Sequence, residues 1–424
     1  MSDRNDYILE KSIDAKWFLA LKLIHRPLLL QTLTSDAVIS GIEKSKVLSQ
    51  VGYNPNFYYP HLNHDAIAVA LSSLIQLRQQ VCQEESNKSI VTLYTERLDE
   101  LILEQKLMLA SVKNDWSLFQ KLNIELYGPM NNKYVFQMMT YLQNKTTFFL
   151  NGNPLSAINI LPVSQTIEIS LFNVAQQLIQ GPDIVVDSNE VYTSETISVA
   201  WNIALRKTIP EWKVVIDGHV TSMLVVHKTR TIKIPQNLKM NANRMRKLFV
   251  HEIGTHVFRR EQGKKNRLQL CSIGLAGNQV FEEGLSIVRS QLVGSKFHQF
   301  GGFDKYLTLS IALGSFDGIP KDFNQTYNII CGYFLNRLNR KRSNLNNFIV
   351  AQDRAWNCTV RIFRGGNPAL PGCCLLKDKI YHEGNRIVWN LIKTKPQFFN
   401  TVMLGKYDPQ NELQREMVIN NAIK

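Results

Sequence analysis

The chain has 424 residues, of which 44% are hydrophobic and 20% charged, and 49 Lys and Arg against 35 Asp and Glu give it a net charge of +14. This composition excludes a disordered or fibrous protein and provides apolar material for a large core. The length predicts more than one packed unit, and the positive charge favours acidic partners such as nucleic acid, anionic lipid or an acidic protein tail.

The first 180 residues are predicted to be mainly helical. Apolar residues recur at helical spacing within four ranges, which are 1–50, 66–81, 95–112 and 115–144. Gly128-Pro129 predicts a turn inside the last range. We therefore expect residues 1–180 to form a helical N-terminal region that packs against the sheet following it.

The pattern changes near residue 181. Short β-branched runs bounded by Gly, Pro and Asp occupy 181–188, 211–218, 221–228 and 229–235. Residues 193–210 have helical spacing and begin with a Thr/Ser cap followed by Glu195. Asp217-Gly218-His219 indicates a hairpin between two of the runs. We predict an α+β fold in which residues 181–424 form the second unit, with a small mixed sheet over the next helix.

Neither secretion nor a membrane span is indicated. The start of the chain, MSDRNDYILEKS, lacks the basic residues and apolar run of a signal peptide. No stretch approaches the roughly 18 uninterrupted apolar residues of a membrane helix. Of six cysteines, only Cys373 and Cys374 are close together, and adjacent cysteines suit neither a zinc knuckle nor a disulfide framework. We expect a soluble, cytoplasmic protein.

The segment LFVHEIGTHVFRREQG (248–263) contains His251, Glu252 and His256 in the pattern His-Glu-x-x-x-His, one residue longer than the His-Glu-x-x-His of zinc peptidases. Positions five apart in a regular helix differ by about 140° around its axis, which is poor for two ligands of one ion. A π-type turn would bring both histidines onto one face, and Gly254 would ease it. We predict such a turn at residues 253–255. Two unrelated histidines are the alternative.

The next predicted helix, residues 280–294, begins with Glu282 and Glu283. Two His and one carboxylate leave a position open on zinc, which is the catalytic form of a zinc site. Glu252 would then act as general base towards water and pass the proton to the leaving amine. The helix dipole alone also favours acidic residues here. The residues by themselves leave open which glutamate is the ligand.

Four ordered blocks resemble the family of the microtubule-associated tyrosine carboxypeptidase, whose bacterial relatives carry a Gln-Glu-Gly-Leu-Ala motif. The blocks are HEIGTHVFRREQG, FEEGLS, RIFRGG (361–366) and KDKIYHEG (377–384), with fainter similarity in NPNFYYP (54–60) and LYGPMN (126–131). The family uses the six-residue His-Glu-x-x-x-His form. The resemblance implies a zincin-like metallopeptidase with Zn²⁺ on His251, His256 and Glu283, the Glu directly before the glycine, and with Glu252 as the general base. Departures at Gln262, Ser286 and Glu383 remove no ligand, and Glu383 bears on substrate choice.

A carboxypeptidase needs a cation for the terminal carboxylate of its substrate, and Arg binds this group bidentately. We expect Arg259 or Lys377 to make the contact, with Arg361 and Arg364 next, and Tyr381 to donate to the oxyanion. The resemblance implies removal of a C-terminal Tyr or Phe from a peptide or protein tail. An acidic, tyrosine-ended tail such as that of α-tubulin fits the charge of the chain.

Two alternatives stay open. The metal site alone does not fix the cleavage position, so a zinc aminopeptidase, with Glu282 near the substrate amino group, or an endopeptidase also fits it. The alternative from another class is a basic partner- or nucleic-acid-binding protein with a vestigial metal site. Against it, the sequence contains no recognised nucleic-acid motif.

Overall fold

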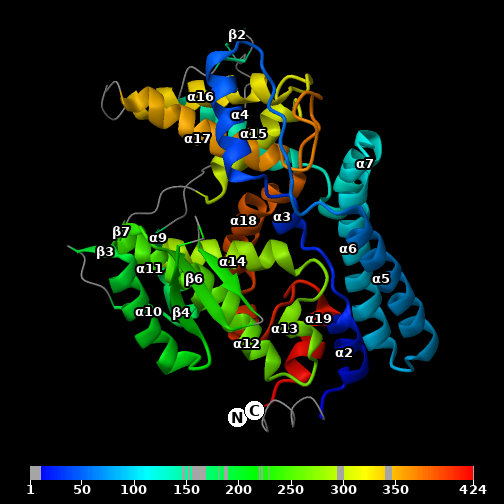
Figure 1. Cartoon of the computed structure of the whole chain (residues 1–424). Helices are drawn as coiled ribbons and strands as arrows, with labels where there is room; N and C mark the ends of the chain where they lie inside the picture. Colours follow the sequence, from blue (N-terminus) through cyan, green and yellow to red (C-terminus); the bar gives the residue numbers. More distant parts are fainter. Residues whose placement is uncertain are drawn as a thin grey trace.

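The N-terminal part of the chain folds into helices, as predicted (Figure 1). The computed structural model describes residues 11–423 except 146–148, 151–152, 155–168, 180, 186–189, 219, 221–222, 228, 294–299 and 340–345. The elements up to residue 180 are α2 (Ala15–Leu23), α3 (Leu29–Thr32), α4 (Ala37–Ser49), α5 (His64–Glu84), α6 (Lys88–Val112), α7 (Trp116–Tyr127), α8 (Asn132–Lys145), the antiparallel pair β1 (Phe149–Leu150) and β2 (Asn153–Pro154), and α9 (Ile169–Leu178).

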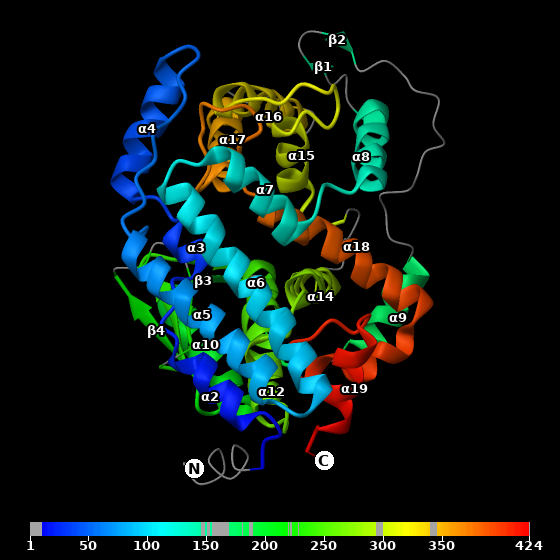
Figure 2. The ribbon, with the colours of Figure 1, turned by 90° about the vertical axis from the view of Figure 1, so that its right-hand side faces the viewer.

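Side-chain caps and one glycine set the limits of these helices. Asn63, Asn87 and Asp115 accept hydrogen bonds from backbone N–H groups in the first turns of α5, α6 and α7. Gly128 follows α7 with a φ of 71°, which costs glycine little. The turn predicted at Gly128-Pro129 is therefore confirmed. α5 and α6 pack side by side along one flank of the molecule (Figure 2).

The middle of the chain forms the sheet layer. It comprises β3 (Val191–Thr193), α10 (Ser194–Thr208), β4 (Lys213–Asp217), β5 (Leu224–Val226), β6 (Thr231–Pro235) and β7 (Lys239–Asn241). The main sheet has the order β4-β6-β5, with β4 parallel and β5 antiparallel to β6. The predicted small mixed sheet is confirmed. β3 and β7 form a separate antiparallel pair.

Some local predictions in this layer are wrong. Residues 181–185 form no strand, and the rest of that run lies outside the described residues. The hairpin at Asp217-Gly218-His219 does not exist, because β4 and β5 each pair with β6 and not with one another; His219 itself lies outside the described residues. The predicted Thr/Ser cap of α10 is confirmed, because Thr193 is the cap and its N–H donates to the Thr196 hydroxyl at 2.8 Å. β7 was not predicted, since three residues show no alternation.

The rest of the chain is helical, so the described residues form a mostly helical α+β protein. These elements are α11 (Ala242–Leu248), the π-helix η1 (Phe249–Val257), α12 (Phe258–Lys264), α13 (Leu270–Ile273), α14 (Asn278–Val293), α15 (Phe303–Ala312), α16 (Phe323–Asn339), α17 (Asn346–Phe363), η2 (Leu376–Asp378), α18 (Lys379–Thr394), η3 (Pro396–Asn400), η4 (Val402–Leu404) and α19 (Glu412–Asn420). No helix among the described residues has the length and apolar character to cross a membrane.

The described N-terminal helices share buried clusters with the C-terminal part of the chain, whereas no described residue before 181 belongs to the buried cluster around the sheet. Leu74 of α5 and Tyr94 of α6 share a buried cluster with Leu270 and Tyr407. The buried cluster around the sheet draws its members from residues 184–257. The expectation that the N-terminal region packs against the sheet is therefore wrong, and buried clusters join segments from both sides of residue 180.

α14 lies at the centre of the molecule, between the sheet layer and the helices above it (Figures 1 and 2). It packs against η1 and α11 on one side and against α18 on another. A Cβ on Gly284 would overlap the carbonyl group of Gly384, and a Cβ on Gly384 would overlap the carbonyl oxygen of Val280. These two glycines thus allow α14 and α18, which carry the FEEGLS block and most of the KDKIYHEG block, to cross in close contact.

Candidate metal centre

The segment with the two histidines forms a π-helix. In η1, which continues α11, the chain is wide enough that the N–H of Phe258 donates to the carbonyl of Ile253, five residues earlier. This wide turn places the rings of His251 and His256 side by side, with centroids 5.1 Å apart. The predicted π-type turn at residues 253–255 is confirmed.

α14 brings a carboxylate to the two histidines. Glu283 Oε2 lies 3.8 Å from His251 Nε2 and 3.7 Å from His256 Nε2. One ligand atom from each of the three residues lies within 4.8 Å of the others, the one such group of His, Cys, Asp and Glu found among the described residues. The side chains are partly exposed, so the group can be reached from solvent.

Glu282 lies behind this group instead of within it. Its carboxylate accepts a hydrogen bond from His256 Nδ1 at 2.9 Å, pairs with Arg259, and lies 3.1 Å from Lys406 Nζ. Burial acts to raise the pKa of Glu282, but Arg259, then Lys406 and His256, lower it well below its usual range. The ionised Glu282 therefore holds His256 by its Nδ1, so that Nε2 faces Glu283.

The three residues fit a zinc ion. Two imidazole nitrogens and one carboxylate oxygen leave a fourth position for water or substrate. A carboxylate on the far nitrogen of a ligating His, as Glu282 is on His256, is the usual outer partner of such a ligand. Burial, and then His256, lowers the pKa of His251 to about 3, which keeps it in the neutral form that binds metal.

Glu252 lies beside the first histidine on η1. Burial raises its pKa above the usual range of a carboxyl group, and His256 acts in the opposite direction. A carboxylate whose pKa is raised both takes and returns a proton more readily near neutral pH. The environment of Glu252 therefore suits a general base.

Arg259 is not available to a substrate. Its side chain is 0% exposed. Its guanidinium donates to Glu282, to the carbonyl of Val402 at 2.8 Å and to the carbonyl of Tyr407 at 3.3 Å. These contacts contradict the prediction that Arg259 binds a substrate carboxylate. Its side chain, one turn after His256, points into the core of the protein and not towards solvent.

The other predicted cations, Arg361, Arg364 and Lys377, differ in the side chains that they contact. Arg361 Nε and Arg364 Nη2 contact Asp378 at 2.7 Å and 3.2 Å. Arg361 Nη2 also donates to the Tyr381 hydroxyl at 2.9 Å. Lys377 directly precedes Asp378, is nearly buried, and its Nζ donates to the side chain of Gln279 in α14. The structure therefore brings Arg361 and Tyr381 together, whereas the contact of Lys377 is with α14.

Sequence reasoning missed Lys305 of α15. Its Nζ lies 4.0 Å from the centre of the Tyr381 ring, and the Arg361 guanidinium lies 5.2 Å from the centre of the same ring. Burial, and then Arg361, lowers the pKa of Lys305 to about 8. The charge of Glu283 acts on the pKa of Lys305, Arg361 and Tyr381, after the larger effect of burial in each case. A single Lys in a helix belongs to no motif, so no sequence signal marked it.

Two departures from the family's pattern have clear surroundings. Ser286 Oγ lies 3.3 Å from His251 Nε2 and donates to the carbonyl of Glu283 at 2.8 Å. Glu383 accepts a hydrogen bond from the Tyr306 hydroxyl at 3.1 Å and faces the end of the LYGPMN block. Ser286 thus touches a candidate ligand, whereas the contacts of Glu383 are internal to the protein.

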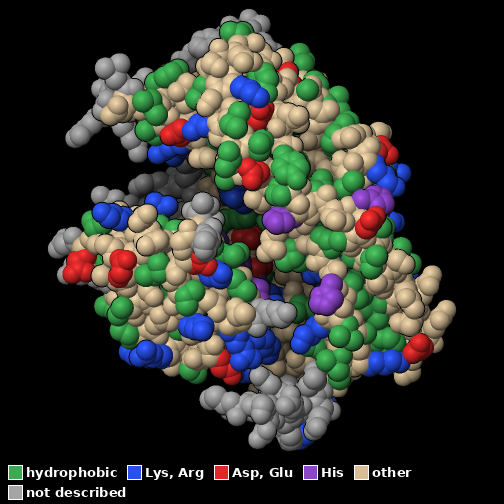
Figure 3. Space-filling view, viewed as in Figure 1, with side chains coloured by type: hydrophobic (Ala, Val, Ile, Leu, Met, Phe, Trp, Pro, Cys, Tyr) green, Lys and Arg blue, Asp and Glu red, His purple; other side chains and the backbone are tan. Residues whose placement is uncertain are grey.

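One face of the molecule is hollowed. Figure 3 shows the hollow between the sheet layer with α14 and the helices α15 to α17, with acidic side chains deep inside and basic side chains on the opposite wall.

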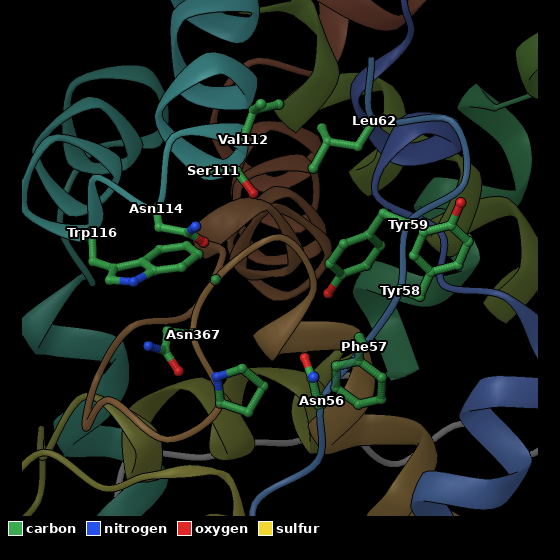
Figure 4. A pocket seen from close by; sticks show the side chains of 12 residues that line it. Asn56, Phe57, Tyr58, Tyr59, Leu62, Ser111, Val112, Asn114, Trp116 and Asn367 are labelled. Carbon is green, nitrogen blue, oxygen red and sulfur yellow. The ribbon is translucent and has the colours of Figure 1, made fainter. Parts of the chain in front are cut away.

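A separate cavity of about 520 Å³ holds none of the candidate ligands. Figure 4 shows Trp116 and Tyr59 on opposite sides of it, with Asn56 and Asn367 along its edge. The hydroxyl of Tyr59 accepts a hydrogen bond from the N–H of Gly365 at 2.8 Å. The cavity therefore lies where the NPNFYYP block meets the RIFRGG block.

The fold and the site define a mostly helical α+β protein with a two-histidine, one-glutamate centre on a π-helix and a neighbouring helix. The family model for the microtubule-associated tyrosine carboxypeptidase matches residues 47–299, more than half of the chain, and the chain belongs to this family of carboxypeptidases. Comparison with curated proteins and with solved structures gave no match.

Proposed function

We propose that this protein is a zinc-dependent carboxypeptidase that removes a C-terminal Tyr or Phe from a protein tail. The observation that carries the proposal is the convergence of His251, His256 and Glu283 within 4.8 Å. Three protein ligands with one open position are the arrangement of catalytic zinc. Membership of a tyrosine carboxypeptidase family supports the same reaction.

We also propose a zincin-like arrangement for this part of the chain, and the packing of the sheet with η1 supports it. The sheet and η1 share one buried cluster, which includes Ile232 and Ile234 of β6 and Phe249 and Ile253 of η1. β5 is the antiparallel edge strand of this sheet. An edge strand offers unpaired backbone groups to an extended peptide, and we propose that β5 binds the substrate in this way.

Each residue of the site has a proposed role in the chemistry. Bound zinc would supply the Lewis acidity that activates water and the scissile carbonyl. Glu252 takes a proton from the attacking water and delivers it to the leaving nitrogen, so that the peptide bond breaks to a carboxylate and an amine. Burial, and then Glu283, raises the pKa of Tyr381. Tyr381 therefore keeps its proton and can donate a hydrogen bond to the oxygen that becomes negative.

Lys305 and Arg361 replace Arg259 in the proposed recognition of the substrate. A terminal carboxylate that leaves water must find a cation, because an unpaired buried charge costs several kcal/mol. Arg361 is 32% exposed, so part of its guanidinium can reach a ligand beyond Asp378. Both cations lie against the Tyr381 ring, next to the proposed scissile bond.

The proposed substrate is an acidic tail that ends in an aromatic residue, such as the tail of α-tubulin. The net charge of +14 would attract such a tail. An aminopeptidase is less well supported, since Glu282, the carboxylate that would bind an amino group, is already paired with Arg259 and Lys406.

Metal analysis of purified variants tests this proposal. We expect about one zinc per chain in the wild type, and loss of zinc in His251→Ala, His256→Ala and Glu283→Gln. Glu252→Gln should keep its zinc and lose turnover, because it removes a base and not a ligand. A wild-type protein that is retained on acidic polymer but binds no zinc and cleaves no peptide would instead support the basic binding protein with a vestigial site.

A further inference from the structure

The π-type turn between the two histidines is held by side chains as well as by its own backbone. Widening a helix disturbs the regular pairing of its carbonyl groups, and a buried carbonyl needs a donor. The hydroxyl of Thr255 donates to the carbonyl of Val250 at 2.8 Å. The carbonyl of Gly254 accepts from the guanidinium of Arg289. Val250 and Thr255 directly precede His251 and His256 in the sequence.

Arg289 comes from α14, the helix that also carries Glu283. Its side chain is 5% exposed. Besides Gly254, its guanidinium contacts the Thr255 hydroxyl at 3.4 Å and the carbonyl of Pro182 at 3.0 Å. Among the described residues, no carboxylate forms an ion pair with it: Asp183, whose charge acts on Arg289, pairs with Arg246 instead. A charge buried among neutral acceptors is costly, which argues that each of these hydrogen bonds is needed.

Two glycines make room for this guanidinium. A Cβ on Gly254 would lie 2.6 Å from the carbonyl oxygen of Pro182 and 2.9 Å from Arg289 Nη1. A Cβ on Gly181 would lie 2.9 Å from Arg289 Nη2. The missing side chain of Gly254 therefore allows Pro182 and Arg289 to approach the backbone of η1 closely, in addition to making the wide turn easier to form.

We propose that Arg289 is a positioning residue for the metal centre, because its guanidinium fixes the π-type turn on which His251 and His256 face Glu283. One side chain thereby ties the backbone between two candidate ligands to the helix that carries the third. The inference rests on the proposed zinc function of the site. Arg289 touches none of the three ligand side chains, so its effect on them passes through the backbone of η1.

Zinc affinity and cobalt spectra of Arg289→Met test the inference. Loss of an outer partner typically lowers metal affinity 10- to 100-fold, and we expect a loss in this range, measured by competition with a chelator. The visible spectrum of the cobalt-substituted variant should shift, because the ligand angles change. Arg289→Lys, which keeps one donor, should recover part of both. The matched control is Arg246→Met. Arg246 and Arg289 line one cavity, but Arg246 pairs with Asp183, so this variant should stay within about twofold of wild type.

Hydrogen exchange separates this inference from the zinc proposal. In metal-free protein, Arg289→Met should speed exchange of the amides of residues 249–258, and Arg246→Met should not. If Arg289→Met does not fold, Thr255→Val, which removes the hydroxyl link alone, should show the same changes to a smaller degree. A folded variant with wild-type exchange in η1 overturns the inference, whether or not the wild type binds zinc. If the wild type binds no zinc but the exchange differs as expected, the zinc proposal fails and the role of Arg289 in fixing the turn stands.

Discussion

Glu282→Gln and Glu283→Gln should damage the protein in opposite ways, although the two residues are adjacent. Glu282 is paired with Arg259, whose side chain is 0% exposed, and with Lys406. Glu283 is 22% exposed and faces the two histidines. The first substitution therefore strands a buried cation, whereas the second removes a candidate ligand and strands none.

The expected sizes follow from these surroundings. Breaking a buried ion pair by removing one partner costs about 3–5 kcal/mol of the free energy of unfolding. The loss of stability in Glu282→Gln should be about 3 kcal/mol, at the lower end of this range, because the amide oxygen can still accept one hydrogen bond. It should keep zinc with an affinity lowered about 10- to 100-fold, as expected for an outer partner of His256. The free energy of unfolding of metal-free Glu283→Gln should lie within about 1 kcal/mol of wild type, and this variant should lose zinc.

The pH dependence of the Glu282 contribution has a definite sign. The cations beside Glu282 lower its pKa in the folded protein, so the ion pair stabilises the fold above the pKa of an unfolded Glu, about 4.3. This stabilisation is lost as the pH falls through the folded pKa. The difference in unfolding free energy between wild type and Glu282→Gln should be full at pH 7 and should shrink below about pH 4.

Urea unfolding of metal-free protein, followed by tryptophan fluorescence, measures the stability, and chelator competition measures the zinc affinity. A Glu282→Gln protein as stable as wild type would show that the pair with Arg259 stabilises nothing. If Glu283→Gln kept full zinc while Glu282→Gln lost it, the ligand would be Glu282 and the account of this site would be wrong.

Three further predictions concern single residues. Glu252→Gln should bind zinc as wild type does and lower kcat by about 10²- to 10⁴-fold, measured with zinc-loaded protein; equal turnover would remove Glu252 from the mechanism. Lys305→Met should raise KM for a free-acid peptide about 10- to 100-fold, the size of one lost charge-assisted hydrogen bond. KM of the wild type should also rise above about pH 8, because Lys305 loses its proton there. A KM that neither the substitution nor the pH changes would exclude this contact. Gly254→Ala should destabilise the fold by about 1–3 kcal/mol in thermal unfolding, because the added Cβ would lie 2.6 Å from the Pro182 carbonyl oxygen. An unchanged stability would mean that Pro182 moves at little cost.

Part of the site could be predicted because its residues lie in ordered motifs. Spacing alone required a wide turn between His251 and His256, since five residues do not return a regular helix to the same face. The choice of Glu283 over Glu282 came from resemblance, and the geometry that separates them depends on Arg259 and Lys406, which no local pattern connects to α14.

The errors have a common physical cause. Arg259 lies one turn from His256, and helical spacing alone did not reveal that it points into the core towards Glu282. Lys305 lies over the Tyr381 ring because α15 packs near α17 and α18. The hairpin at Asp217-Gly218 was wrong because local turn residues do not determine strand order. Contacts between segments distant in sequence decide all three.

Paired peptides that differ only at the C-terminus test the central claim most directly. One peptide ends in Glu-Tyr with a free carboxylate, and the other carries the same sequence with an amidated end. We expect zinc-loaded wild-type protein to release one tyrosine from the free acid, seen by mass spectrometry, and to leave the amide intact, while Glu252→Gln releases none. Equal cleavage of both peptides, or cleavage at an internal bond, would contradict the assignment of a carboxypeptidase.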